Sequence, residues 1–270
     1  MTSLSVPEGS VSLALRDSAT MLRRSLRRIV RYPSMTLMLI GLPLVLLFLF
    51  VFVFGGTLGA GLGDPSGGRA EYVNYVAPAI VMMTIAGTAQ GTAISIAMDM
   101  TAGIIARCRT MAIARTAVLT GHVLASVIQA MISLMIVIAV AVGIGFRPTA
   151  GPVEWLTAAG LLVLVTFAFT WLSVAFGLVS KSVETASNLP SFLVLLPFFG
   201  SGFVPTDSMP TALRWFADYQ PFTPVIETLR GLLLGGPIGN NAVIAIAWCV
   251  GGGLLAYLWA KRLFNHRAMR

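Results

Sequence analysis

Six long apolar runs dominate this chain of 270 residues and constrain its fold more than any other feature. Most of the runs approach the roughly 20 residues that a helix needs to cross about 30 Å of hydrocarbon. An isolated strand would leave its backbone amides unpaired in lipid, so each run is predicted to be a helix. The sequence therefore predicts an all-α integral membrane protein with six transmembrane helices, at residues 34–54, 72–97, 117–145, 155–179, 188–204 and 242–260.

The basic residues lie almost entirely on one side of these predicted helices. If the connecting segments alternate between the two faces of the membrane, 14 of the 18 Lys and Arg residues share the face of both termini, and 4 lie on the other face. Cytoplasmic loops carry such an excess, which places both termini in the cytoplasm. The net charge of +8 then reflects topology and contact with anionic lipid headgroups, not binding of nucleic acid. Three regions follow: a cytoplasmic N-terminus (1–33), a membrane domain (34–260) and a basic cytoplasmic tail (261–270).

The N-terminal region contains a predicted amphipathic helix at residues 11–31. At about 100° per residue, Leu22, Leu26 and Ile29 lie on one arc, and a group of arginines lies on the opposite arc. Such a helix lies in the membrane interface, and Pro33 would end it. The alternative is a positively charged anchor without a defined helix. The arginines expected to meet lipid phosphates are Arg23, Arg24, Arg27, Arg28 and Arg31.

Small and hydroxyl side chains recur at helical spacing along one face of the second, third and fourth runs. Such faces are typical of close helix packing in lipid, and Gly87 with Gly91 forms a small-xxx-small pair. The alternative is a substrate path, which Gln129 fits because an amide is costly in lipid without a partner. Three such faces together favour a common interior or a subunit seam. Their residues are Thr84, Thr88, Gly91 and Ser95; His122, Ser126, Gln129 and Ser133; and Thr166, Thr170, Ser173 and Gly177.

The outer segment 205–239, between the fifth and sixth runs, is apolar but interrupted by four prolines. Two short helices fit it, and the second is predicted to have Thr223 as its N-cap and to end at Gly235. Glu227 and Arg230 lie three residues apart on this helix and are expected to pair. The helix is too short to cross the membrane, so we expect it to enter the outer leaflet and return.

The sequence lacks the motifs of several enzyme classes. No GxxxxGK[ST] loop is present, so this chain is not expected to hydrolyse ATP by that route. HExxH and GxSxG motifs and carboxylate clusters with metal spacing are also absent. His122 is expected to be a packing residue, and no acidic residue lies at mid-depth in a predicted span. The chain is therefore predicted not to be an enzyme.

The cytoplasmic segment 98–115 is short, amphipathic and basic, and it continues into the third run. It fits a small helix with a cationic end that docks into an acidic cleft on a soluble partner. The alternative is a loop that follows the positive-inside rule. The residues alone leave both interpretations open.

Two blocks of this sequence resemble the permease subunits of type 2 ABC exporters, in the daunorubicin-resistance group. The first block, GIIARCRTMAIARTAVLTGHVLA at residues 103–125, has the family's Gly, an R-x-R pair, and an Arg ahead of AVL-x-G-x-VLA. The second block spans residues 177–235. The chain departs from the family's pattern at Met100, Thr101 and Ala106, where charged residues are common, and at Ala112, where Pro is usual. The matching positions in the second block are Pro197, Ser201, Phe203, Pro205, Met209, Pro210, Gln220, Pro221, Thr223, Pro224 and Arg230.

This resemblance covers nearly the whole chain and implies a fold and partners. The fold would have an interfacial N-terminal helix, six spans, a cytoplasmic coupling helix at residues 103–109, and re-entrant outer helices before the last span. The partners would be a second permease copy, identical or different, and two copies of a separate ATPase subunit that binds ATP and Mg²⁺. No cofactor is expected on this chain. The residues that would couple to the ATPase are Gly103, Ile104, Arg107, Arg109 and Arg115.

The predicted function is that of the membrane subunit of an ATP-driven exporter in a bacterial plasma membrane. Its substrate would be an amphiphilic or hydrophobic drug, antibiotic or lipid, because the polar faces offer hydroxyl and amide groups but no fixed charge. One alternative is a secondary transporter without an ATPase, which internal repeats would support. Another is an intramembrane enzyme that depends on His122. A permease for glycan or glycolipid export is disfavoured by the lack of an intramembrane cation.

Overall fold

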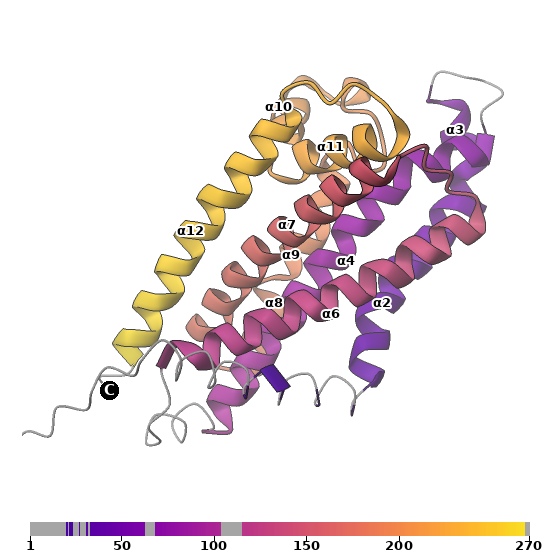
Figure 1. Cartoon of the computed structure of the whole chain (residues 1–270). Coiled ribbons are helices and arrows are strands. Elements are labelled where there is room, and N and C mark those ends of the chain that lie inside the picture. Colours follow the sequence, from indigo (N-terminus) through magenta and orange to yellow (C-terminus); the bar gives the residue numbers. More distant parts are fainter. Residues whose placement is uncertain are drawn as a thin grey trace, which may run out of the picture.

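The computed structural model of the chain describes residues 33–62, 68–103 and 115–267, together with five positions among residues 20–31. All of the regular structure in these residues is helical. Figure 1 shows the long helices running alongside one another, with α3, α10 and α11 at one end of the bundle and the C-terminus at the other. The elements are α2 (Pro33–Phe48), the π-helix η1 (Leu49–Phe54), α3 (Gly55–Ala60), α4 (Gly68–Thr101), α6 (Arg115–Ile144), α7 (Pro152–Val179), α8 (Val183–Asn188), α9 (Ser191–Leu195), the 3₁₀ helices η2 (Leu196–Phe199) and η3 (Thr206–Ser208), α10 (Thr211–Tyr219), α11 (Phe222–Leu234) and α12 (Asn241–Arg267).

Five helices of the described chain are long and apolar enough to cross a membrane. They correspond to the first, second, third, fourth and sixth apolar runs, so these five predicted helices are confirmed. Several extend beyond their predicted ends. The first continues through η1 and α3 to Ala60, and α4 reaches 34 residues. A helix of that length is about 50 Å long, which exceeds the hydrocarbon thickness.

The prediction of one continuous helix at residues 188–204 is wrong. This run forms the short helices α8, α9 and η2, which begin at Val183 and end at Phe199. Two prolines explain the interruptions, because proline has no N–H to donate and its ring crowds the preceding turn. Pro190 lies between α8 and α9, and Pro197 lies in η2.

A side chain of α4 supplies a hydrogen bond where this run is interrupted. Gln90 Nε2 donates to the carbonyl oxygen of Ser187 at 2.8 Å and to Ser191 Oγ at 2.9 Å. Further along the run, the Tyr72 hydroxyl donates to the carbonyl oxygen of Phe203 at 3.2 Å. The interrupted run therefore follows α4 from Gln90 to Tyr72, a distance of about 27 Å at the rise of an α-helix.

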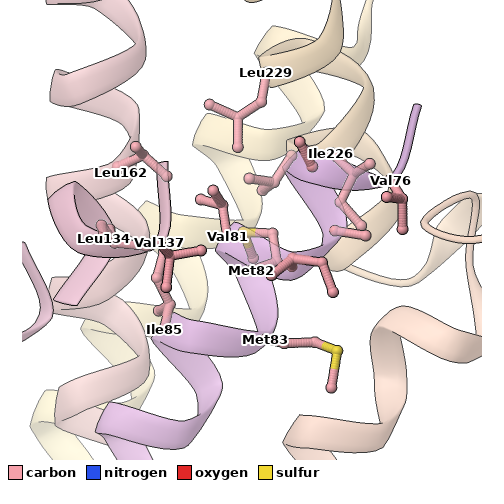
Figure 2. Packing of buried hydrophobic residues seen from close by; sticks show 14 of the residues in the cluster. Val76, Val81, Met82, Met83, Ile85, Leu134, Val137, Leu162, Ile226 and Leu229 are labelled. Carbon is pink, nitrogen blue, oxygen red and sulfur yellow. The ribbon is translucent and has the colours of Figure 1, made fainter. Parts of the chain in front are cut away.

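Helix α4 lies at the centre of the bundle. In the most apolar 18-residue stretch of α4, 72% of the residues are buried, and in that of α7, 67% are buried. In the corresponding stretches of the outer helices α2, α6 and α12, only 22–28% are buried. Figure 2 shows the buried side chains around α4, with Leu134 and Val137 of α6 and Leu162 of α7 on one side and Ile226 of α11 on the other. The exposed apolar faces of the outer helices are suited to lipid.

Glycines allow two close approaches to α4. At Gly177 of α7, an added Cβ would lie 2.8 Å from the carbonyl oxygen of Ala93 and 3.0 Å from Ile96 Cβ. At Gly91, an added Cβ would lie 3.1 Å from a methyl carbon of Leu39 on α2. The carbonyl oxygen of Leu39 also faces Gly87, and Pro43 deprives that oxygen of its usual helical partner. The predicted small-xxx-small pair therefore lies at a helix crossing.

The interfacial helix predicted at residues 11–31 lies mostly outside the described residues. The described positions Thr20, Leu22, Arg23, Arg27 and Arg31 are all helical. Leu22 is half-buried and the three arginines are exposed, as amphipathic separation requires. Arg24 and Arg28 lie outside the described residues.

Candidate functional site

The three predicted polar faces are largely buried inside the bundle, and part of the α4 face, at Gly87 and Gly91, packs against Leu39 of α2. Most of their side chains are fully buried. Several hydroxyls bond within their own helix, as Thr84 does to the carbonyl oxygen of Ile80 at 2.9 Å. Thr92 Oγ1 of α4 donates to Ser126 Oγ of α6 at 2.7 Å, a bond that crosses between helices. The buried members of the predicted set are Thr84, Thr88, Ser126, Ser133, Thr166, Thr170 and Ser173, while Ser95 and Gln129 are half-buried.

A second cluster, Tyr75, Ser201, Glu227 and Arg230, joins α11 to α4 at the α11 end of the bundle. The guanidinium of Arg230 pairs with Glu227 Oε1 at 2.5 Å. Its Nη2 donates to the carbonyl oxygens of Tyr75 at 3.1 Å and Ser201 at 3.0 Å. The guanidinium carbon also lies 3.9 Å from the centre of the Tyr75 ring, within cation–π range. The predicted Glu227–Arg230 pair is confirmed, and we call this set of residues the Arg230 cluster.

The segment between η2 and α11 packs tightly against the Arg230 cluster. Gln220 Nε2 donates to the carbonyl oxygen of Leu196 at 3.1 Å, and the Ser201 amide donates to Thr223 Oγ1 at 3.3 Å. An added Cβ at Gly200 would lie 2.4 Å from Gln220 Nε2. The prediction that Thr223 is the N-cap of α11 is wrong, because α11 begins at Phe222. The Thr223 hydroxyl instead accepts a hydrogen bond from the Ser201 amide. The predicted end at Gly235 is confirmed by its left-handed φ of 75°.

The opposite end of the bundle contains a buried acid–base pair. His122 Nε2 of α6 lies 3.1 Å from Asp99 Oδ2 of α4, and the two residues are 9% and 4% exposed. The sequence placed Asp99 in the cytoplasmic segment 98–115, and the structure shows that this residue lies in the last turn of α4, which continues to Thr101. His122 packs as expected, but its partner is a carboxylate.

The predicted coupling segment follows directly after this pair. Gly103 lies in a turn after α4 with a φ of +66°, a left-handed conformation that favours glycine. Ile104, Arg107 and Arg109 lie outside the described residues, and Arg115 is the first residue of α6. The two helices that flank the coupling segment are therefore described, and their roles in coupling stay predictions.

Sequence reasoning missed three polar residues that join separate elements. Gln90 contacts the interrupted run, Tyr75 contacts Arg230, and Asp99 contacts His122. The sequence did contain a signal for Gln90. An isolated amide in an apolar run needs a hydrogen-bond partner, and this reasoning applies to Gln90 as it does to Gln129. No local pattern links Tyr75 to Arg230, which are 155 residues apart. Among the described residues, no group of three or more His, Cys, Asp or Glu side chains could hold a metal ion.

Comparison with known proteins assigns the family. Residues 17–234 match the model of the ABC-2 type transporter family. The daunorubicin resistance ABC transporter permease protein DrrB1 of Streptomyces coeruleorubidus is 24% identical over 245 residues, which cover 90% of this chain and 83% of that protein. A probable doxorubicin resistance ABC transporter permease protein DrrC of Mycobacterium tuberculosis is 23% identical over 159 residues, or 59% of this chain and 58% of its own length. This chain belongs to the ABC-2 type transporter family and is a multi-pass membrane permease.

Proposed function

We propose that this chain is the membrane subunit of an ATP-driven exporter. The family match over residues 17–234 carries the proposal. The helical bundle supports it, because five long apolar helices enclose buried hydroxyl groups. ATP hydrolysis would take place on a separate subunit, present in two copies, and a second permease copy would complete the membrane unit.

The topology that we propose has six crossings, with the interrupted run 183–199 as the fifth. Together with the segment that continues to Phe203, this run follows α4 for about 27 Å, close to the thickness of the hydrocarbon core. Gln90 supports a membrane location, since it supplies a hydrogen bond that water cannot provide there. Helices α10 and α11 would form the outer re-entrant pair, and both termini would be cytoplasmic, in agreement with the Lys and Arg distribution.

An amphiphilic or hydrophobic drug, antibiotic or lipid is the substrate class that we propose. Two relatives are named for resistance to daunorubicin and doxorubicin. The buried faces of this chain offer hydroxyl groups from α4, α6 and α7, together with the Gln129 amide. Such a surface suits a molecule that is apolar over most of its area and carries a few hydrogen-bonding groups.

Purification of the chain from its native membrane in mild detergent tests the proposal. We expect a stoichiometric partner with a phosphate-loop motif and vanadate-sensitive ATP hydrolysis. The second candidate function is a secondary transporter, favoured by the buried Asp99 carboxylate, since proton-coupled carriers use such groups. A chain that purifies alone, without ATPase activity, and transports in response to a proton gradient would establish that alternative.

Reversal of two charges tests the coupling segment. Arg107→Glu with Arg109→Glu is expected to abolish substrate-stimulated ATP hydrolysis and transport, because the cationic end would then repel an acidic cleft. The yield of correctly inserted chain should not change. Lys261→Glu with Arg262→Glu is the matched control, since it reverses as many charges on the same proposed face. Normal transport by the Arg107/Arg109 variant would contradict the docking role.

Replacement of one amide tests the proposed substrate path. Gln129→Leu is expected to change the ratio of transport rates between two substrates severalfold, while the amount of assembled complex stays constant. The physical reason is the loss of an orienting hydrogen bond on α6. Ile128→Leu, at the neighbouring exposed position, is the control. An unchanged ratio, or a fall in assembly alone, would indicate that Gln129 serves helix packing.

A further inference from the structure

Two polar contacts join α4 to α6 on the side of the bundle that leads to the coupling segment. The first is the Thr92–Ser126 hydrogen bond at 2.7 Å, and the second is the Asp99–His122 contact at 3.1 Å. Their partners lie seven residues apart on α4 and four residues apart on α6, as expected for antiparallel helices. All four side chains are buried. These contacts form a polar seam between the two helices.

The position of Asp99 cannot be explained by helix formation. It lies in the last turn of α4, where the exposed carbonyl groups give the helix its negative end and disfavour an acidic side chain. Ile96 of α4 and Leu119 and Val123 of α6 belong to one buried apolar cluster, which packs the two helices together near this end of the bundle. His122 supplies a bond from α6, and separation of the two helices here would leave a buried carboxylate without it.

The polar seam lies at the base of the coupling segment. Asp99 is two residues before the end of α4, and His122 is seven residues after the start of α6. Residues 104–114 are therefore connected at both ends to helices that the seam joins. If the contacts of the polar seam persist, a displacement of this segment moves α4 and α6 together. If these contacts break, the same displacement moves one helix relative to the other.

We propose that Asp99 and His122 are positioning residues that fasten α4 to α6, so that the two helices move as one body when an ATPase subunit displaces residues 104–114. The proposal rests on the proposed function for the source of that displacement. It assigns to the pair a role in transmission, distinct from contact with substrate or nucleotide.

A reversible cross-link tests whether the two helices move together. Thr92→Cys with Ser126→Cys, in a background with Cys108→Ser and Cys249→Ala, places two thiols where the hydroxyl oxygens are 2.7 Å apart. We expect the oxidised, cross-linked complex to transport as fast as the reduced complex. Loss of transport on oxidation, with recovery on reduction, would overturn the proposal because it would show that transport requires α4 and α6 to separate.

The role of the pair itself is tested by the amount of substrate transported per ATP hydrolysed. His122→Leu is expected to lower this ratio severalfold while ATP hydrolysis and complex assembly persist. His122→Gln, which keeps a donor near the position of Nε2, should restore part of the ratio. Thr228→Val is the matched control, since its buried hydroxyl donates to the carbonyl oxygen of Pro224 within α11, outside the proposed substrate path. An unchanged ratio in His122→Leu would overturn the proposal.

A readout that does not depend on transport separates this inference from the proposed function. In the Thr92→Cys/Ser126→Cys chain, the initial rate of disulfide formation reports how closely α4 and α6 are held. We expect His122→Leu to slow this rate severalfold, and an unchanged rate contradicts the fastening role. Absence of coupled ATP hydrolysis in the unmodified complex would instead count against the proposed function.

Discussion

Arg230→Ala is expected to destabilise the permease by about 2–4 kcal/mol, somewhat less than the roughly 3–5 kcal/mol for breaking a fully buried ion pair, because the Arg230 and Glu227 side chains are 16% and 30% exposed. The substitution removes the bonds to Tyr75 and Ser201 and leaves Glu227 without its counter-charge. The measurement is thermal unfolding in mild detergent. We expect a fall of about 10 °C, given the usual 2–4 °C per kcal/mol for a chain of this size.

Arg214→Ala is the matched control for this experiment. Arg214 of α10 contacts Asp207 of η3 and Asp218 of α10, but its side chain is 48% exposed, against 16% for Arg230. Exposed ion pairs contribute about 0–1 kcal/mol, so a small shift is expected. The shift in unfolding temperature for Arg230→Lys should lie between those of the two alanine variants. Lysine keeps the positive charge but lacks the planar guanidinium with its several N–H donors. Equal shifts for Arg230→Ala and Arg214→Ala would contradict the structural role of the Arg230 cluster.

Gly177→Val is expected to destabilise the permease by about 1–3 kcal/mol through overpacking. The added Cβ would lie 2.8 Å from the backbone carbonyl oxygen of Ala93, which cannot move aside as a flexible side chain can. Helix α7 must therefore shift away from α4, and packing is lost along their shared interface. Thermal unfolding and size-exclusion chromatography in detergent would measure the effect.

Gly160→Val provides the comparison for Gly177→Val on the same helix. Gly160 is exposed, and no atom lies within 4 Å of an added Cβ there. Both substitutions bring the same change in helix propensity, so the difference between them isolates the packing of α7 against α4. If the two variants unfold at the same temperature, the close approach at Gly177 contributes nothing to stability.

Most of the bundle could be predicted from the sequence, because length and apolar content are local properties of each run. Five predicted spans are helices, and the Glu227–Arg230 pair follows from three-residue spacing on one helix. The single helix predicted at residues 188–204 failed for a local reason as well. The prediction followed the apolar character of the run. Pro190 and Pro197 have the larger effect, because each removes a helix hydrogen bond.

The partners within the candidate sites could not be predicted, because they depend on how helices pack. Asp99 pairs with His122 across 23 residues, and Arg230 reaches Tyr75 across 155 residues. No spacing rule connects positions on different helices, and the sequence-based end of α4 was placed before Asp99. The sequence showed that the hydroxyl groups share helix faces, but which neighbouring helix buries each face is a property of the folded bundle.

The interrupted run 183–199 also affects how force crosses the molecule. A continuous helix is stiff along its axis because every turn is braced by hydrogen bonds to the next. A helical segment that is interrupted at Pro190 and Pro197 bends when it is compressed along its axis. It therefore transmits little axial force from one end to the other. Axial force between the two ends of the bundle must then travel through the unbroken helices around it. The interrupted run is held against α4 by Gln90, and Tyr72 holds the segment that follows it at Phe203.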